Sequence, residues 1–255
     1  MAEYRKILYS LDGPVAHLTL NRPEKRNALD AEMIAEVRRA LTASAADPEI
    51  RVVLLSGAGK DFCAGADLAA LQQIANATVM ENVADARQLA DLFLEMRRHP
   101  RPIVAAVHGR ALAGGCGIAT AADIILAAES AQFGYPEVKI GFVPAMVMAI
   151  VRRSVSEKRA FELLTSGEPF SARTALEIGM INRIFPDVSF DQEVQSYTAQ
   201  FATRSASALA LTKSLLYQID AMAFEAALSA GVHANAIARM TEDCRHGVEQ
   251  FLKKP

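Results

Sequence analysis

The chain has 255 residues, a mass of 27.5 kDa, a formal net charge of −2 and a sequence pI near 6.2. A chain of this size can bury a sizeable core, and its charge gives no global basic field for a phosphate backbone, so we expect no nucleic-acid partner. The three cysteines (Cys63, Cys116 and Cys244) are odd in number and too scattered for a zinc site, which predicts reduced thiols and a cytoplasmic protein. The charged N-terminal segment and the lack of an apolar run of roughly 18 residues predict neither a leader nor a membrane span.

The first half of the chain predicts strands that alternate with helices. Residues 6–21 read as a hairpin around the turn Asp12-Gly13-Pro14, because Val15, His17 and Thr19 alternate with three apolar residues. Asp30 is placed as a helix N-cap, since apolar residues follow it at helical spacing up to the segment "ADPE". The segment "RVVLLSG" is continuously apolar, as in a strand buried on both faces, and leads into the loop "AGKDFCAGADL".

Further along, the same alternation continues. Helical spacing connects Leu68, Leu71 and Ile74 and resumes from Leu89 to Met96, with "NATVMEN" between the two patterns. A strand "PIVAAVHG", a glycine-containing loop, a short helix and a strand "DIILAA" follow. Together these elements predict an α/β core.

From about residue 190 the predicted strands stop. Residues 196–219 and 222–240 read as amphipathic helices, the second with Phe224, Leu228 and Val232 on one side. Apolar helices that follow a complete core often dock subunits together. We therefore predict a core over residues 1–190 and a helical oligomerisation region over residues 191–255.

Two strand-to-helix loops could carry chemistry. In "FCAGADL" and in "HGRALAGGCG", small residues would let a ligand approach the backbone closely, so that main-chain N–H groups serve as donors. Gly114 opens a helix, where N–H groups lack intrahelical partners and the dipole is positive. Taken singly, either loop is also consistent with an ordinary turn.

Together the motifs resemble the enoyl-CoA hydratase/isomerase (crotonase) family. The segments that carry the resemblance are "NRPEKRNALD", "FCAGADL", "RPIVAAVHGRALAGGCG", "AQFGYPEVKIGFVP" and "SGEPFSARTALEIGMINRIFP". The resemblance covers nearly the whole chain. It implies a spiral of ββα units with a C-terminal helical trimerisation region, a homotrimer or a hexamer of paired trimers, and an acyl-CoA substrate.

The resemblance also implies the site residues. Ala64 and Gly114 match the two amides that hold the thioester oxygen, and Glu137 matches one of two catalytic glutamates. Gly117 falls on the other glutamate, so this chain has one acid where a typical hydratase has two. The resemblance implies substrate contacts at Lys25, Arg26, Ala28, Ala66, Asp67, Leu68, Gly117, Phe251 and Lys254.

These assignments leave three functions open. The first is a hydratase that adds water to a 2-enoyl-CoA, with a branched or glutaconyl-type acyl chain. The second is an isomerase that moves a double bond with Glu137 as the sole proton shuttle, which a single carboxylate favours. The third is a non-catalytic, RNA-binding relative, against which the lack of a basic stripe counts. We expect no metal and no redox cofactor, because an oxyanion hole of backbone amides needs neither; coenzyme A is part of the substrate.

The absence of a side chain at Gly117 suggests a further hypothesis. A glutaconyl-type substrate brings its own carboxylate, and Gly117 would leave room for it, whereas a glutamate would repel it. Arg110, Lys139 and Arg152 are candidate counter-charges, although surface positions are the more common setting for such residues. We expect a structural role for His108, burial without reactivity for Cys63 and Cys116, and a loop-fixing role for Asp67.

Overall fold

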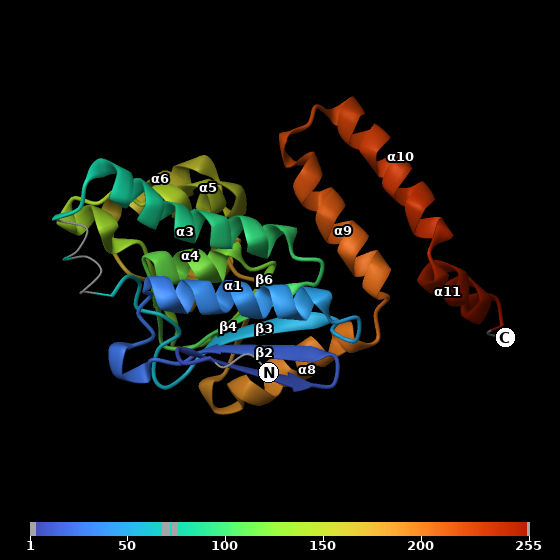
Figure 1. Cartoon of the computed structure of the whole chain (residues 1–255), viewed down its shortest axis with the longest axis horizontal. Helices are drawn as coiled ribbons and strands as arrows, with labels where there is room; N and C mark the ends of the chain where they lie inside the picture. Colours follow the sequence, from blue (N-terminus) through green and yellow to red (C-terminus); the bar gives the residue numbers. More distant parts are fainter. Residues whose placement is uncertain (1–3, 68–71, 73–75, 254–255) are drawn as a thin grey trace.

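The computed structural model describes residues 4–67, 72 and 76–253, and within them a mixed sheet forms the core (Figure 1). Its strands lie in the order β1-β2-β3-β4-β6-β9. Only the β1–β2 pair is antiparallel, as the predicted hairpin requires, and the other neighbours in this sheet are parallel. The strands are β1 (Ile7–Asp12), β2 (Val15–Leu20), β3 (Val52–Gly57), β4 (Ile103–Val107), β6 (Ile124–Ala128) and β9 (Arg183–Phe185).

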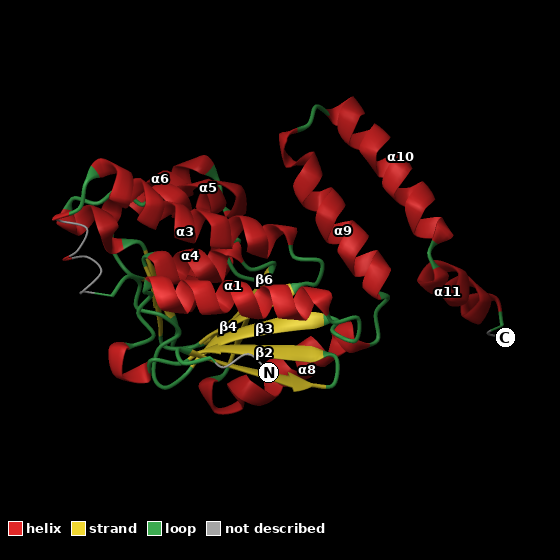
Figure 2. Cartoon of the chain, in the orientation of Figure 1, coloured by secondary structure: helices red, strands yellow, loops and turns green. Residues whose placement is uncertain are grey.

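Helices cover both faces of this sheet (Figure 2). On one face, α1 (Ala31–Ala46) begins at Asp30, whose side chain accepts a hydrogen bond from the Met33 amide, as the sequence predicts. Beside α1 lies α3 (Val79–Arg98), which starts with a capping box between Thr78 and Glu81. The predicted helix through Leu68, Leu71 and Ile74 lies outside the described residues. Further helices are α4 (Gly114–Ala121), α5 (Ala145–Ser154), α6 (Glu157–Ser166) and α7 (Ala172–Glu177).

A second, smaller sheet lies at the ends of the main strands. It joins β5 (Arg110–Leu112), β7 (Gln132–Gly134) and β8 (Phe170–Ser171), with β5 parallel to β7 and β7 antiparallel to β8. The short 3-10 helix η2 (Pro136–Ile140) directly follows β7, and a second one, η1 (Pro23–Lys25), follows β2. This sheet brings the two predicted loops into one region.

The C-terminal helices divide differently from the prediction. Residues 196–219 form no single helix, because α8 (Phe190–Ala202) ends before the Ser205 side chain caps α9 (Ala206–Gln218). Helix α8 packs on β2, β3 and β6, so it belongs to the core layer. The part that leaves the core therefore starts at α9. It continues through the 3-10 helix η4 (Ile219–Ala221) into α10 (Phe224–Met240) and α11 (Glu242–Leu252), and these two helices bury no residue in this chain (Figure 1).

A buried ammonium fastens α9 to the core. The Lys213 side chain is 7% exposed, and its Nζ donates to the carbonyls of Met96 and Arg101 at 2.9 and 3.1 Å and to Asp123 at 2.7 Å. Tyr217, one turn later, donates to the other oxygen of Asp123 at 2.5 Å. Burial lowers the Lys213 pKa, and the adjacent Asp123 carboxylate opposes that shift. Among the helices of the described residues, none has the length and apolar character to cross a membrane.

Candidate active site

Three chain segments meet where the small sheet joins the main one. Cys63 pairs with Ala111 in a parallel bridge, and Leu112 pairs with Gly134 between β5 and β7. Gly65, with φ +98°, permits the close approach, because a Cβ there would lie 2.9 Å from the Ala113 Cβ. The loop after β3, the start of α4 and the segment after β7 are therefore neighbours.

The first loop offers its amide from Ala66, not from Ala64. The Ala64 N–H donates to the Arg26 carbonyl at 3.0 Å, so the prediction that it holds a substrate oxygen is wrong. Leu29 forms hydrogen bonds with the residues on both sides of Ala66. Its N–H donates to the Gly65 carbonyl at 2.7 Å, and its carbonyl accepts from the Asp67 N–H at 2.9 Å. In such a parallel bridge the Ala66 N–H points away from Leu29. It donates to no group among the described residues, and Ala66 is exposed.

The second amide belongs to Gly114, the first residue of α4. An N–H at this position has no intrahelical acceptor, and within the described chain it donates to no other group. Ala113, which precedes it, has φ +49°, a conformation that costs energy for a residue with a Cβ. Its own N–H donates to the Gly134 carbonyl at 2.8 Å. This strained residue turns the chain so that α4 begins beside the Ala66 loop.

Glu137 is a half-buried residue whose carboxylate has one buried, unused oxygen. It lies in η2, which follows β7 and begins at Pro136. Oε2 is buried and accepts no hydrogen bond from any described group. Burial raises the pKa of the Glu137 carboxyl above its ordinary value. A buried acceptor without a protein partner is costly unless something else fills that role, which is expected of a group that meets water or substrate.

A neutral polar cluster lies close to Glu137. The Tyr135 hydroxyl and the Thr120 hydroxyl lie 2.8 Å apart, and the Cys116 carbonyl accepts from Thr120 at 2.7 Å. Burial raises the pKa of the Cys116 thiol to about 11 and raises that of Tyr135 well above its ordinary value, and the Glu137 charge adds to both shifts. These groups stay neutral, so Glu137 is the group of this cluster that can exchange a proton near neutral pH.

Gly117 leaves no room for a second group. A Cβ on Gly117 would lie 2.4 Å from Val147 Cγ1 and 2.9 Å from Phe93 Cζ, and both of these side chains are buried. The hypothesis that Gly117 makes space for a substrate carboxylate is therefore wrong on this side of α4. The space that a side chain at residue 117 would need is filled by the bulkier α5 segment and by α3.

The candidate counter-charges all have other partners. Arg110 holds Asp61 through two hydrogen bonds of 2.8 Å. Lys139 pairs with Glu168 at 2.9 Å, and Arg152 pairs with Glu157 at 2.9 Å. Each pair is local to its own surface region. No cation of this set is left for a carboxylate at the site.

Several other predicted residues surround the Ala66 loop. Lys25 is exposed and its Nζ lies 3.7 Å from Asp67 Oδ2. Ala28 is buried and offers its carbonyl to Arg22, while Arg26 gives its carbonyl to Ala64. Asp67 is buried in an ion pair with Arg22, which agrees with a loop-fixing role.

Of the three remaining predicted substrate contacts, Phe251, Leu68 and Lys254, the structure describes only Phe251. Phe251 lies on α11, away from the core of its own chain (Figure 1). Leu68 and Lys254 lie outside the described residues.

The remaining candidates are structural. His108 shares a 2.9 Å hydrogen bond between its Nε2 and the Gly59 carbonyl. Cys63 is buried, its Sγ donates to the Asn27 carbonyl at 3.0 Å, and burial raises its pKa to about 12. A thiol with such a pKa is no nucleophile at neutral pH.

Sequence reasoning missed three residues that shape the site. Arg22 ties the Ala66 loop to the start of α1, Ala113 carries the strained turn, and Val147 closes the space at Gly117. Arg22 lies within the quoted motif "NRPEKRNALD", and a buried partner for Asp67 could have been sought there. An alanine at residue 113 gives no sequence signal of a positive φ.

Comparison with known proteins identifies the family of the chain. A model of the family Enoyl-CoA hydratase/isomerase matches residues 11–255. A Thermus thermophilus protein that carries enoyl-CoA hydratase as a provisional name is 41% identical over 242 residues, which are 95% of this chain and 96% of the relative. The 2,3-dehydroadipyl-CoA hydratase of Escherichia coli is 32% identical, over 98% of this chain and 96% of the relative.

The fold has close structural counterparts as well. The crystal structure of an enoyl-CoA hydratase from Mycobacterium smegmatis superimposes with a TM-score of 0.93 at 31% identity, over 98% of this chain and 96% of that one. The predicted α/β architecture with a C-terminal helical region is thereby confirmed. The chain is an enzyme with the crotonase fold, and it belongs to the enoyl-CoA hydratase/isomerase family.

Proposed function

We propose that this enzyme adds water to a short, neutral or branched 2-enoyl-CoA, with Glu137 as the proton-transfer group and the Ala66 and Gly114 amides around the thioester oxygen. The observation that carries the proposal is the buried Glu137 Oε2, on the segment next to the Ala66 and Gly114 amides. Among the described residues, neither this oxygen nor these two N–H groups have a hydrogen-bond partner. The proposal includes no metal and no redox cofactor, because an oxyanion hole of backbone amides needs neither, and coenzyme A enters as part of the substrate.

The reaction follows from these groups. The carboxylate accepts a proton from water, the resulting hydroxide adds to C3, and negative charge moves onto the thioester oxygen. Two amide donors stabilise that charge, and one such donor is typically worth on the order of 10²–10³ in rate. Glu137 then returns the proton to C2, which neutralises the enolate. One carboxylate can thus balance the addition, without the second acid that Val147 and Phe93 exclude.

We propose a neutral acyl chain because the site offers a charged one neither space at Gly117 nor a free counter-charge among the candidates. The space at Gly117 is closed by apolar side chains, and Arg110, Lys139 and Arg152 are paired with other carboxylates. A glutaconyl-type carboxylate would find no free cation in this set. The Escherichia coli relative is named for an acidic acyl chain, so the distinction between neutral and acidic chains belongs in the test.

The isomerase remains a second candidate because of the same single carboxylate. Glu137 could remove a proton from C2 of a 3-enoyl-CoA and return it to C4, while the two amides hold the dienolate. That reaction needs no water at the site. The two functions therefore differ in the substrate that is consumed and in whether a hydroxyl group appears in the product.

A substrate panel separates these functions. The purified protein is assayed with crotonyl-, 3-methylcrotonyl-, 3-methylglutaconyl- and 3-enoyl-CoA, with chromatography of the products. We expect 3-hydroxyacyl products from the neutral 2-enoyl thioesters at a higher kcat/KM than from 3-methylglutaconyl-CoA. A double bond that moves in the 3-enoyl substrate, with no hydroxyl product from any thioester, would establish the isomerase and refute the hydratase.

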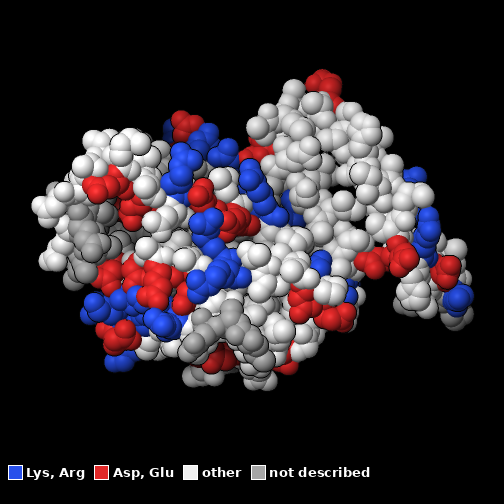
Figure 3. Space-filling model, in the orientation of Figure 1, with Lys and Arg blue, Asp and Glu red and all other residues white. Residues whose placement is uncertain are grey.

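We also propose that the arm formed by α9, α10 and α11 assembles three chains, or two such trimers. Phe224, Leu228 and Val232 on α10 are 73%, 57% and 68% exposed, which is costly for a continuous apolar stripe. On the face that Figure 3 shows, helices α9 and α10 carry few charged side chains compared with the core. Assembly would bring Phe251 of one chain toward the site of another, where the resemblance places a coenzyme A contact.

The assembly is tested by light scattering on a matched pair of variants. Val232→Asp places a charge in the α10 stripe, and Val188→Asp makes the same change at a residue that is 98% exposed next to α8. We expect the wild type and Val188→Asp to have the mass of a trimer or hexamer and Val232→Asp to dissociate. A wild-type monomer at micromolar concentration would refute the proposal.

A further inference from the structure

The guanidinium of Arg22 joins three parts of the chain around the Ala66 loop. Its Nη1 donates to the Ala28 carbonyl at 2.7 Å and lies 2.9 Å from Asp30 Oδ2, while its Nη2 lies 2.7 Å from Asp67 Oδ2. The Arg22 side chain is 12% exposed, and that of Asp67 is 6% exposed. These are charge-assisted contacts with little access to water.

Two of these contacts lie beside the amide that we assign to the thioester oxygen. Asp67 directly follows Ala66, and Ala28 directly precedes Leu29, the partner of Ala66 in the parallel bridge. Arg22 thus holds one residue on each strand of the bridge. The direction of the Ala66 N–H depends on this bridge, because Leu29 bonds to the peptides on both sides of it.

We infer that Arg22 is a positioning residue for the oxyanion hole, which acts through Asp67 and Ala28 on the direction of the Ala66 amide. This inference rests on the proposed function, since it assigns a task to one donor of that site. In the proposed reaction, Arg22 itself makes no contact with the reacting atoms.

Charge alone does not explain the choice of arginine. Lys6 already pairs with Asp30 at 2.5 Å, and Lys25 lies 3.7 Å from Asp67, so both carboxylates have a second cation nearby. What neither lysine provides is a planar group that reaches a carbonyl and two carboxylates at once. A lysine at residue 22 would keep the charge and lose that geometry.

Arg22→Lys therefore separates positioning from charge. A displaced donor lowers the rate of the chemical step by up to about 10²-fold, while the rest of the coenzyme A contacts remain. We expect kcat to fall about 10- to 100-fold, with KM within about 3-fold. Polarisation of the bound thioester is read directly from a chromophoric cinnamoyl-CoA, whose absorption moves to the red when its carbonyl oxygen receives hydrogen bonds. This red shift should shrink in the variant.

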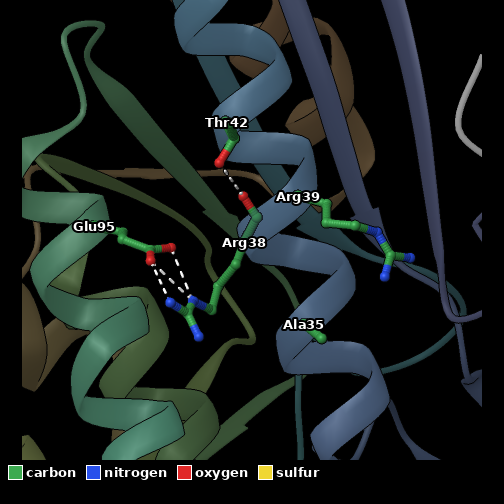
Figure 4. Close-up of a pocket in the computed structure, with 5 residues that line it drawn as sticks. All are labelled: Ala35, Arg38, Arg39, Thr42 and Glu95. Atoms are coloured by element: carbon green, nitrogen blue, oxygen red, sulfur yellow. Dashed lines mark hydrogen bonds and ion pairs between the residues drawn. The ribbon is translucent and has the colours of Figure 1, made fainter.

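The matched control is Arg38→Lys. Arg38 on α1 forms a comparable bidentate pair with Glu95 on α3, with Nε at 3.0 Å from both carboxylate oxygens, and this pair links α1 to α3 rather than to the Ala66 loop (Figure 4). We expect this variant to keep the wild-type kcat and red shift. Asp67→Asn is the second test variant, and its effect should be non-additive with that of Arg22→Lys, because both act on one contact.

The outcomes are distinct. A wild-type red shift that Arg22→Lys and Asp67→Asn both retain overturns the role of Arg22 and leaves the proposed function standing. A loss of kcat that Arg38→Lys reproduces also overturns it, since the effect is then one of general stability. A wild-type protein that binds cinnamoyl-CoA and leaves its absorption unmoved overturns the oxyanion hole, and this inference with it.

Discussion

Glu137→Gln is expected to lower kcat on the order of 10²- to 10⁴-fold while KM changes little. Gln keeps the shape of the side chain but cannot accept the proton of water, whereas the amides of Ala66 and Gly114 still hold the thioester. Steady-state kinetics with crotonyl-CoA measure both constants. Glu168→Gln is the matched control, because Glu168 is an exposed carboxylate that pairs with Lys139. A Glu137→Gln enzyme with half of the wild-type kcat would show that another group transfers the proton.

The same residue predicts the acidic side of the pH profile. Burial raises the Glu137 pKa, so the base is lost as the pH falls through a value above the roughly 4.3 of an ordinary glutamate. The raised pKa also means that the ionised form opposes folding, so a neutral Gln should not lower the melting temperature at neutral pH. Loss of activity with unchanged Tm therefore separates chemistry from unfolding. A profile whose acidic limb survives in Glu137→Gln would contradict the assignment.

Gly117→Ala is expected to destabilise the protein by about 1–3 kcal/mol, although it adds one methyl group. The new Cβ would lie 2.4 Å from Val147 Cγ1, so α5 must shift or Val147 must move. Val147→Ala removes that atom and alone leaves a cavity, which is also destabilising. The double variant should be less destabilised than the sum of the two, because the added methyl occupies the vacated space. Urea unfolding of the four proteins measures this coupling.

Gly247→Ala is the matched control for that cycle. Gly247 lies in α11 with no atom within 4 Å of the position of its Cβ, so alanine there should be neutral or stabilising. Additive effects at Gly117 and Val147 would show that the two positions do not compete for space. The same competition means that Gly117→Glu alone should unfold or inactivate the enzyme rather than rebuild a two-acid site. A rebuilt site needs a smaller residue at 147 as well.

The strand and helix elements were largely predictable, because their signals are local. The N-cap at Asp30, the hairpin around Gly13 and the buried strand β3 each follow from neighbouring residues. The break between α8 and α9 was missed, because "FATRSASALA" continues the apolar spacing. It is marked only by the Ser205 side chain, which caps α9.

The site was predictable as a set of loops but not atom by atom. Ala64 and Ala66 are chemically equivalent in sequence, and the choice between them depends on which N–H the 22–29 segment occupies. That pairing joins segments far apart in the chain. The closed space at Gly117 likewise depends on how α5 packs against α4, which the composition of "AMVMAIVRR" indicates only as added bulk.

The buried Lys213 has a consequence for how the chain matures during synthesis. Asp123 and the carbonyls of Met96 and Arg101 leave the ribosome well before α9, yet it is α9 that supplies their ammonium. A nascent chain that ends before α9 therefore holds these acceptors in a core that has not closed. Truncation should be tolerated unequally. Loss of α10 and α11 removes helices that bury nothing in their own chain, whereas loss of α9 strips the partly buried Asp123 carboxylate of its cation. A stop codon before residue 206 should yield a product that is degraded, whereas a stop codon after residue 218 should yield a folded core.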